Sequence, residues 1–246
     1  MVVIVIPLGL GGWVSHPLLG HTSFLVEING KRILLDAGEG TYRALRRCGF
    51  EVTDIDLVLI THRHGDHILG LPTLALFSKL RGKVLRVYGP DDLDLNALFN
   101  ILGITNYLPA IDYRPVAPSN EASLVLDEQG IRVFSVSADH TVKALAYRIE
   151  ANDDCLTYSG DTRPSGNIAR LARGCKALIH EVSGNPGLEG VTHEHGHSTT
   201  LDAVKVAREA GVKYLIPAHY YVESPIILMQ EGLGLIIPLP CTPILL

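Results

Sequence analysis

The segment that most constrains the fold is residues 61–67, in which three histidines and an aspartate lie within six residues. It directly follows the apolar run 57–60, which predicts a fully buried strand. A strand that ends in such a cluster delivers its side chains to one edge of a sheet. Because imidazole and carboxylate bind zinc, manganese and iron, the spacing His-x-His-x-Asp-His predicts a metal site rather than a polar surface loop.

The composition fits one globular domain over residues 1–246, with 47% apolar and 19% charged residues. The formal net charge of −5 lacks the basic excess that is typical of nucleic-acid-binding proteins. The four cysteines lie far apart and form no Cys-x-x-Cys pair: Cys48, Cys155, Cys175 and Cys241. We interpret them as buried or free thiols in a reducing compartment.

Neither end of the chain has the pattern of a membrane segment. Residues 1–6 lack a basic region and a small-residue cleavage site, so they predict a strand rather than a signal peptide. The apolar tail, residues 226–246, is interrupted by Glu231, glycines and prolines, which favours a strand or packed coil over a transmembrane helix. We therefore expect a cytoplasmic protein with no membrane partner.

Predicted strands and helices alternate along the chain. Strands are expected over residues 2–8, 22–28, 32–36, 56–61, 83–88, 112–116, 121–126, 131–137, 144–150, 155–159, 177–179 and 214–218. Helices are expected over residues 39–48, 67–80, 91–102, 162–173 and 199–210, the third capped by Asp91 or Asp92. The dipeptide Asn29-Gly30 predicts a hairpin, a turn is expected at 152–154, and the glycines of 9–12 allow a close backbone approach to a site.

Four apolar runs end in residues that bind metals or transfer protons: His62 onward, Asp161, His180-Glu181 and His219. Such strand ends converge although they lie far apart in the sequence. The pattern predicts an α+β fold, a four-layer αβ/βα sandwich with a metal site at one edge of two facing sheets. Taken singly, each residue has an ordinary alternative. His140 fits a surface histidine, Asp161 a turn or helix cap, and His219 a half-buried histidine.

Taken together, these motifs resemble the successive metal motifs of the metallo-β-lactamase superfamily: His62-x-His64-x-Asp66-His67, His140, Ser159-Gly160-Asp161-Thr162 and Ala218-His219. Further motifs are similar to its ribonuclease Z branch: residues 159–164, His180-Glu181, residues 196–200, and Asp139-His140 leading into Tyr147-Arg148. The resemblance extends from about Gly9 to Tyr220.

The resemblance implies a hydrolase with two Zn²⁺ per chain, with Mn²⁺ or Fe²⁺ as alternatives, that attacks its substrate with a metal-bridging hydroxide. One metal is expected on His62, His64 and His140, the other on Asp66, His67 and His219, with Asp161 bridging them. Asp66 also counts among the catalytic residues, together with His197 and Glu181. A homodimer is implied by the resemblance alone.

His197 precedes Ser198 and Thr199, which can cap the following helix. We therefore expect an imidazole and a helix N-terminus to face one spot, suited to phosphate binding or to protonation of a leaving oxygen. In the family this histidine works with the acid of the His-Glu motif, here Glu181; the alternative for Glu181 is a supporting or surface carboxylate. His180 is predicted to be structural. No role is assigned to four further histidines: His16, His21, His193 and His195.

Ribonuclease Z enzymes carry a long Gly-rich arm that grips tRNA, usually between the counterparts of His140 and Asp161. Here residues 141–160 are filled by two predicted strands and a turn. We therefore predict a phosphodiesterase of a small nucleotide, cyclic nucleotide or short RNA end, and not of intact tRNA. Two alternatives stay open, a metal-dependent hydrolase of a sulfate ester, thioester or lactone, and a non-catalytic metal-binding sensor or partner protein. The seven ligand candidates argue against the second alternative.

Overall fold

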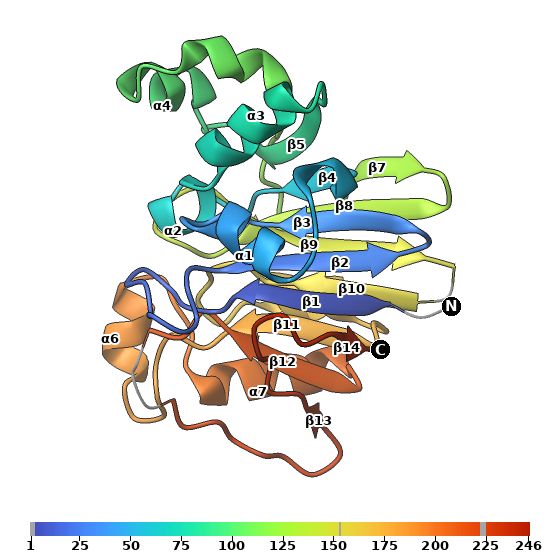
Figure 1. Cartoon of the computed structure of the whole chain (residues 1–246). Coiled ribbons are helices and arrows are strands. Elements are labelled where there is room, and N and C mark those ends of the chain that lie inside the picture. The colour runs from blue at the N-terminus through green and yellow to red at the C-terminus, as the bar shows by residue number, and fades with distance from the viewer. Residues whose placement is uncertain (1–2, 153, 222–224) are drawn as a thin grey trace.

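Two β-sheets face each other, and helices cover their outer sides (Figure 1). The computed structural model describes residues 3–152, 154–221 and 225–246, and within these ranges each sheet has seven strands. The N- and C-terminal strands are neighbours in the first sheet, where Ile4 lies opposite Leu245.

The first sheet has the strand order β14-β1-β2-β3-β4-β5-β6. Its strands are β1 (Ile4–Gly9), β2 (Ser23–Ile28), β3 (Lys31–Leu35), β4 (Leu57–Leu59), β5 (Leu85–Pro90), β6 (Ile111–Val116) and β14 (Ile244–Leu245). β2 and β3 form the predicted hairpin, in which Asn29 and Gly30 both have positive φ angles, 49° and 73°. Because β3 to β6 run parallel, their carboxyl ends share one edge of the sheet.

The second sheet has the order β13-β12-β11-β10-β9-β8-β7. Its strands are β7 (Ser123–Glu128), β8 (Ile131–Ala138), β9 (Ala144–Ala151), β10 (Asp154–Tyr158), β11 (Ala177–Glu181), β12 (Tyr214–Ala218) and β13 (Gly234–Leu235). β10, β11 and β12 run parallel, so their carboxyl ends also lie together. Two predicted positions, Val2 of the first strand and Asp153 of the turn at 152–154, lie outside the described residues.

The helices are α1 (Thr41–Arg47), α2 (Gly65–Ile68), α3 (Leu71–Leu80), α4 (Leu95–Ile101), α5 (Gly166–Ala172), α6 (Glu189–Glu194) and α7 (Thr200–Ala210), with short 3₁₀ turns η1 (Val52–Asp54) and η2 (Thr105–Ala110). The predicted helix 67–80 is divided into α2 and α3 because Gly70 packs against the turn after β3. A β-carbon on Gly70 would lie 2.4 Å from the Gly38 carbonyl oxygen. Asp94 caps α4 in place of the predicted Asp91 or Asp92, by accepting a hydrogen bond from the Ala97 N–H. α6 was not predicted.

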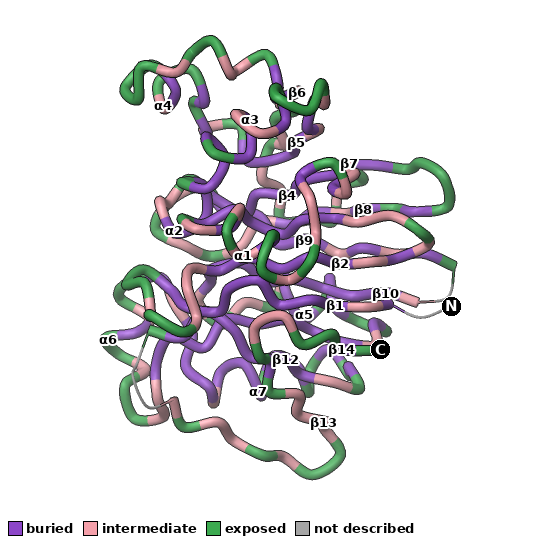
Figure 2. The backbone as a smooth tube through the Cα atoms, in the orientation of Figure 1, coloured by how far each residue is buried: buried purple, intermediate pink, exposed green. Residues whose placement is uncertain are grey.

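Alternate residues of each strand belong to different layers of the core. In β2, Phe24 and Val26 face the second sheet, whereas Leu25 packs under the helices α1 to α4. Most strands are buried, whereas the edge strands β6 and β7 and the outer surfaces of the helices carry exposed residues (Figure 2). The predicted αβ/βα sandwich is confirmed.

The cysteine interpretation is wrong, because all four cysteines form disulfides. Cys48 pairs with Cys241 across 193 residues of sequence, with Cα atoms 4.9 Å apart, and Cys155 pairs with Cys175 at a Cα distance of 4.7 Å. The spacing of the cysteines in the sequence indicated neither pair, because contact between distant cysteines depends on the tertiary fold. The argument for a reducing compartment therefore loses its basis.

The described part of the apolar tail consists of coil and turns with the short strands β13 and β14, in line with the predicted strand or coil. Within residues 3–152, 154–221 and 225–246, every helix is too short or too polar to cross a membrane.

Candidate metal centre and active-site cavity

The structure brings the seven predicted metal ligands together at one edge of the sandwich. His62, His64, Asp66 and His67 follow β4 of the first sheet. The other three come from the second sheet, where His140 follows β8, Asp161 follows β10 and His219 follows β12. The convergence has a simple cause, because the carboxyl ends of β4, β10 and β12 point to the same edge.

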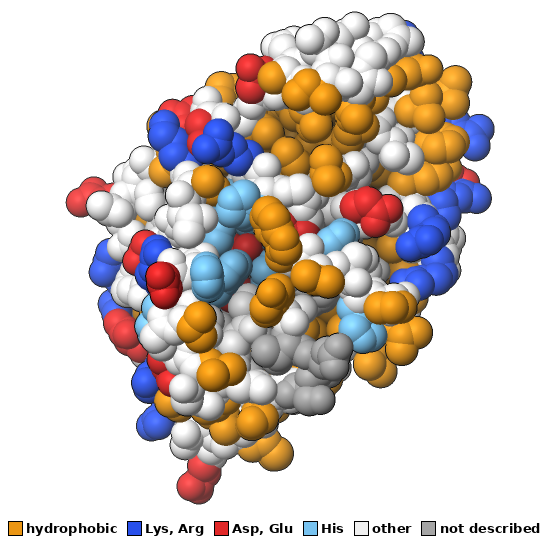
Figure 3. All heavy atoms as spheres, turned by 90° about the vertical axis from the view of Figure 1, so that its left-hand side faces the viewer, with side chains coloured by type: hydrophobic (Ala, Val, Ile, Leu, Met, Phe, Trp, Pro, Cys, Tyr) orange, Lys and Arg blue, Asp and Glu red, His pale blue; other side chains and the backbone are white. Residues whose placement is uncertain are grey.

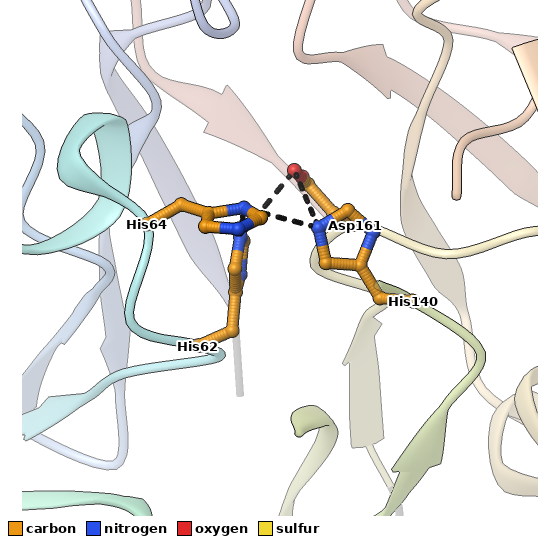
Figure 4. A group of neighbouring side chains, drawn as sticks. All are labelled: His62, His64, His140 and Asp161. Carbon is orange, nitrogen blue, oxygen red and sulfur yellow. Dashed lines mark hydrogen bonds and ion pairs between the residues drawn. The ribbon is translucent and has the colours of Figure 1, made fainter. Parts of the chain in front are cut away.

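The first group consists of His62, His64, His140 and Asp161, whose polar atoms point toward one another (Figure 4). Nδ1 of His64 lies 3.0 Å from Nε2 of His62 and 3.1 Å from Nε2 of His140. Oδ2 of Asp161 lies 3.5 Å from Nε2 of His62. Ligand atoms bound tetrahedrally to one zinc ion at 2.0–2.1 Å are roughly 3.4 Å apart, so the spacing fits a divalent cation.

The second group consists of Asp66, His67, His219 and again Asp161, all of them buried. Oδ1 of Asp161 lies 3.4 Å from Nε2 of His67 and 3.3 Å from Nε2 of His219, and Oδ2 of Asp66 lies 3.1 Å from the latter atom. Among the described residues, Asp66 Oδ1, His67 Nε2 and Asp161 Oδ1 are buried without a hydrogen-bond partner. Such orphaned polar atoms are rare in proteins, and a cation bound in this group would contact His67 Nε2 and Asp161 Oδ1.

The charges of the two groups also suit a cation. Burial lowers the pKa of His62, of His140 and, to about 4, of His64, so these rings are neutral near pH 7, the form that binds metal. Burial alone would raise the pKa of Asp66 and Asp161, but the neighbouring imidazoles lower both, and both side chains are ionised. In the first group, neutral donors thus adjoin buried negative charge. In the second group, burial alone would lower the pKa of His67, but the carboxylates of Asp161 and Asp36 raise it well above its usual value.

Asp36, a residue that was not predicted, holds the second group from behind. It is fully buried directly after β3. Its carboxylate accepts hydrogen bonds from Nδ1 of His67 at 2.8 Å, from the Tyr158 hydroxyl at 2.6 Å and from the Thr61 N–H at 2.7 Å. These bonds direct Nε2 of His67 toward the other ligands. The sequence did give one indication of this role, because Asp36 ends a buried strand beside the strand that precedes the His/Asp cluster.

Other contacts orient the remaining rings. Nδ1 of His140 lies 2.8 Å from the Gly196 carbonyl oxygen, and Nδ1 of His219 lies 3.0 Å from the Ser183 hydroxyl. The predicted glycine loop does approach the site, since a β-carbon on Gly12 would lie 2.8 Å from the His219 ring. His140 and His219 are therefore held with their Nε2 atoms toward the ligand groups.

The predicted pair of His197 and Glu181 is in direct contact. Nδ1 of His197 lies 3.0 Å from Oε1 of the fully buried Glu181. The same carboxylate accepts hydrogen bonds from the Thr162 N–H at 2.8 Å and the Ser183 hydroxyl at 2.7 Å. Burial by itself lowers the pKa of His197, but the Glu181 carboxylate beside it raises that pKa to about 9. His180 is buried and, by strand alternation, points to the opposite face of the sheet.

The N-terminus of α7 was predicted to face the site, and this prediction is wrong. Thr199 caps the helix, accepting a hydrogen bond from the Asp202 N–H while the Asp202 carboxylate accepts one from the Thr199 N–H. Ser198 and Thr199 are both fully buried. The helix donors near the site are thus used internally, and His197 alone faces the cavity from this segment.

The four histidines without an assigned role lie apart from both ligand groups. His193 is half-buried with Nε2 2.8 Å from the Asp202 carboxylate. His195 is exposed and lines the cavity. His16 and His21 border a separate, smaller hollow beside the glycine loop.

A cavity of about 570 Å³ opens over the ligands, within the usual range for small-molecule sites. His64, His140, His197 and His219 lie on its polar side. Hydrophobic side chains surround the histidines on this face of the molecule (Figure 3), and those that line the cavity are Trp13, Leu188, Val191 and Tyr221. The site therefore combines a cation-binding floor with an apolar rim.

Comparisons with known proteins place this site in a family. Residues 31–220 match the beta-lactamase superfamily domain. The chain belongs to the metallo-β-lactamase superfamily. The ribonuclease Z of Methanothermobacter thermautotrophicus is 31% identical to it, over 86% of this chain and 84% of its own length. The ribonuclease Z of Methanopyrus kandleri is 32% identical, over 86% and 85% of the two chains. The short form of human tRNase Z, 22% identical, has the same fold with a TM-score of 0.85 over 98% of both chains.

The predicted ribonuclease Z-like branch is confirmed by these relatives. The chain is a hydrolase of phosphodiester bonds, as predicted. Membership in this family also implies the use of a divalent metal, which both ligand groups fit.

Proposed function

We propose that this protein is a dinuclear zinc-dependent phosphodiesterase that hydrolyses a small nucleotide or the end of a short RNA. The observation that carries the proposal is the double ligand group, in which the two oxygens of Asp161 face different sets of histidines. A single residue shared in this way suits two cations held close together.

His62, His64 and His140 would hold one zinc ion, Asp66, His67 and His219 the other, and Asp161 would contact both. When bound, the two ions supply Lewis acidity and a water molecule that ionises near neutral pH. Mn²⁺ and Fe²⁺ suit the same nitrogen and oxygen donors. Asp66 has a second role in the proposal, because its buried Oδ1 has no partner among the described residues and can accept a proton from the attacking water.

His197 protonates the oxygen that leaves phosphorus. Its Nδ1 is occupied by Glu181, so the proton is transferred from Nε2, and the side chain, 20% exposed, lines the cavity. Glu181 keeps the ring oriented and favours its protonated form. His197 is thus the general acid of the proposal, and Glu181 is its positioning residue.

A small substrate is supported by the absence of extra chain near the site. β9 ends at Ala151 and β10 begins at Asp154, which leaves no space for an arm between His140 and Asp161. The relative from Methanothermobacter aligns over 262 positions, whereas 86% of this 246-residue chain is about 212 residues. That ribonuclease Z therefore has about fifty residues within the aligned region that this chain lacks.

The test is a substrate panel on the zinc-loaded chain, with metal content measured on the same sample. We expect two zinc ions per chain, hydrolysis of bis-p-nitrophenyl phosphate, and no comparable hydrolysis of the sulfate ester, thioester and lactone included as alternatives. A tRNA precursor completes the panel. Cleavage of that precursor faster than a dinucleotide would overturn the small-substrate proposal, and fewer than two zinc ions after reconstitution would overturn the dinuclear site.

Three further features stay predictions: a single domain over residues 1–246, a homodimer, and a cytoplasmic location. Light scattering on the purified chain measures the second directly.

A further inference from the structure

Two exposed aromatic side chains lie at the rim of the cavity, next to the metal ligands. Trp13 is 61% exposed, and its ring centroid lies 5.5 Å from that of the ligand His64, with the planes at 88°. Tyr221 is 58% exposed and lines the same cavity. Leu188 and Val191, also exposed, extend this apolar wall. An exposed apolar cluster at the mouth of a site marks a surface that a ligand covers.

The backbone that carries the two aromatic residues is fixed. The Gly12 N–H donates to the Tyr220 carbonyl at 3.0 Å, and the Tyr220 N–H donates to the Leu10 carbonyl at 2.9 Å. Trp13 is the residue after Gly12, and Tyr221 is the residue after Tyr220, so the two aromatic residues lie next to this hydrogen-bonded pair. The Thr22 hydroxyl also donates to the Gly11 carbonyl at 2.8 Å. Both side chains therefore begin from neighbouring positions on a rigid platform.

The apolar and aromatic side chains of this wall favour a ligand that carries a flat, uncharged ring. Its four side chains carry no charge, so they offer no ion pair to a second phosphate. Aromatic side chains bind nucleobases by stacking, whatever the base, since every base has a π face. Because Trp13 contacts a metal ligand, a ring stacked on it would adjoin a phosphate bound at the metals.

We propose that Trp13 and Tyr221, flanked by Leu188 and Val191, form a subsite that stacks the nucleobase next to the scissile phosphodiester. The inference rests on the proposed phosphodiesterase function and names its substrate class, a nucleotide ester rather than a simple phosphodiester. It assigns Trp13 to substrate specificity, a role separate from metal binding and proton transfer.

The kinetic test compares two esters with the same leaving group on the zinc-loaded chain. Thymidine 5′-(p-nitrophenyl phosphate) has a base, and methyl p-nitrophenyl phosphate has none. Trp13→Ala should raise KM for the thymidine ester about tenfold or more and change kcat/KM for the methyl ester less than about twofold. Trp13→Phe, which keeps a flat ring, should restore most of the difference, and Tyr221→Ala should act in the same direction as Trp13→Ala.

The matched control is Ile101→Ala, which removes a side chain that is 83% exposed on α4 and does not line the cavity. This variant should leave KM and kcat/KM unchanged for both esters. An equal loss for both esters in Trp13→Ala would assign Trp13 to the structure of the loop and overturn the subsite.

A second readout does not depend on turnover, because Trp13 is the single tryptophan of the chain. Adenosine 5′-monophosphate should quench its fluorescence, whereas ribose 5-phosphate, which has the phosphate without the base, should not. Hydrolysis of both esters with unchanged fluorescence would overturn the subsite and leave the proposed function intact. Quenching by the nucleotide without hydrolysis of any ester would overturn the proposed function and leave the subsite intact.

Discussion

The two ligand groups share Asp161 but differ in how they are built. In the first group, His64 and His140 are only partly buried and lie beside the cavity. In the second group, all members are buried, Asp66 adds a second carboxylate, and Asp36 supports His67 from behind. The first group is thus the more open of the two, although Asp66 and His219 also line the cavity, and we expect the second group to bind its cation more firmly. More negative charge and a fixed second layer both strengthen metal binding.

The largest effect is expected from Asp161→Asn, which damages both groups at once. An amide has a similar shape but no charge, so both ions should be lost or bound far more weakly. Without them, activity should fall more than about 10⁴-fold, because metal ions supply several kcal/mol of transition-state stabilisation. Metal content and kcat/KM are the measurements. Asp127→Asn, at an exposed position on β7, is the matched control. Retention of both zinc ions would refute the shared ligand.

His197→Ala should separate chemistry from metal binding. The variant lacks the general acid but leaves all seven ligands in place, so kcat should fall roughly 10²- to 10⁴-fold with two zinc ions still bound. His16→Ala, which changes a histidine beside a different hollow, should have wild-type activity. If a good leaving group such as p-nitrophenolate masks the loss, an ester with an alkyl leaving group should show it in full. Wild-type turnover of that alkyl ester would remove His197 from the mechanism.

Asp36→Asn should act mainly on the second group. The Asp36 carboxylate holds Nδ1 of His67, and loss of its charge should weaken metal binding in that group by roughly 10- to 100-fold. The first group contacts Asp36 only indirectly, through the Thr61 hydroxyl that lies 3.0 Å from Nδ1 of His62, and should lose less affinity. Stepwise zinc titration with a competing chelator measures both affinities. Equal weakening of the two sites would contradict the difference in construction described above.

The smallest effect is expected in the pH profile. His197 donates its proton from the charged form, which is populated below its pKa of about 9, so kcat should fall as the pH rises through that value. Glu181→Gln removes the carboxylate that raises this pKa, and the alkaline limb should therefore move to lower pH. The pH dependence of kcat for the two proteins is the measurement. An unmoved alkaline limb would mean that another group titrates there.

The convergence of the seven candidate ligands could be predicted because four of them lie within six residues and the others follow apolar strands. The contact of Glu181 with His197 also followed from the resemblance. Asp36 could not be recognised in this way, since it lies behind the candidate ligands and contacts them through its hydrogen bond to His67. The cysteine pairs and the break at Gly70 depend on which distant segments meet, and local patterns carry no information about that. The N-terminus of α7 was misjudged because Asp202 completes its capping box and uses the donors that a phosphate would need.

The origin of the ligands in both sheets has a thermodynamic consequence. Four candidate ligands follow a strand of the first sheet and three follow strands of the second, so bound cations would join the two halves of the sandwich at that edge. Since the unfolded chain cannot present this arrangement, every ion bound to the native protein adds to the free energy of unfolding, by about 2.7 kcal/mol when free metal is at a hundred times its Kd. Metal bound at this edge would therefore stabilise the packing of one sheet against the other as well as supply chemistry, and the concentration of free metal would set the size of that stabilisation.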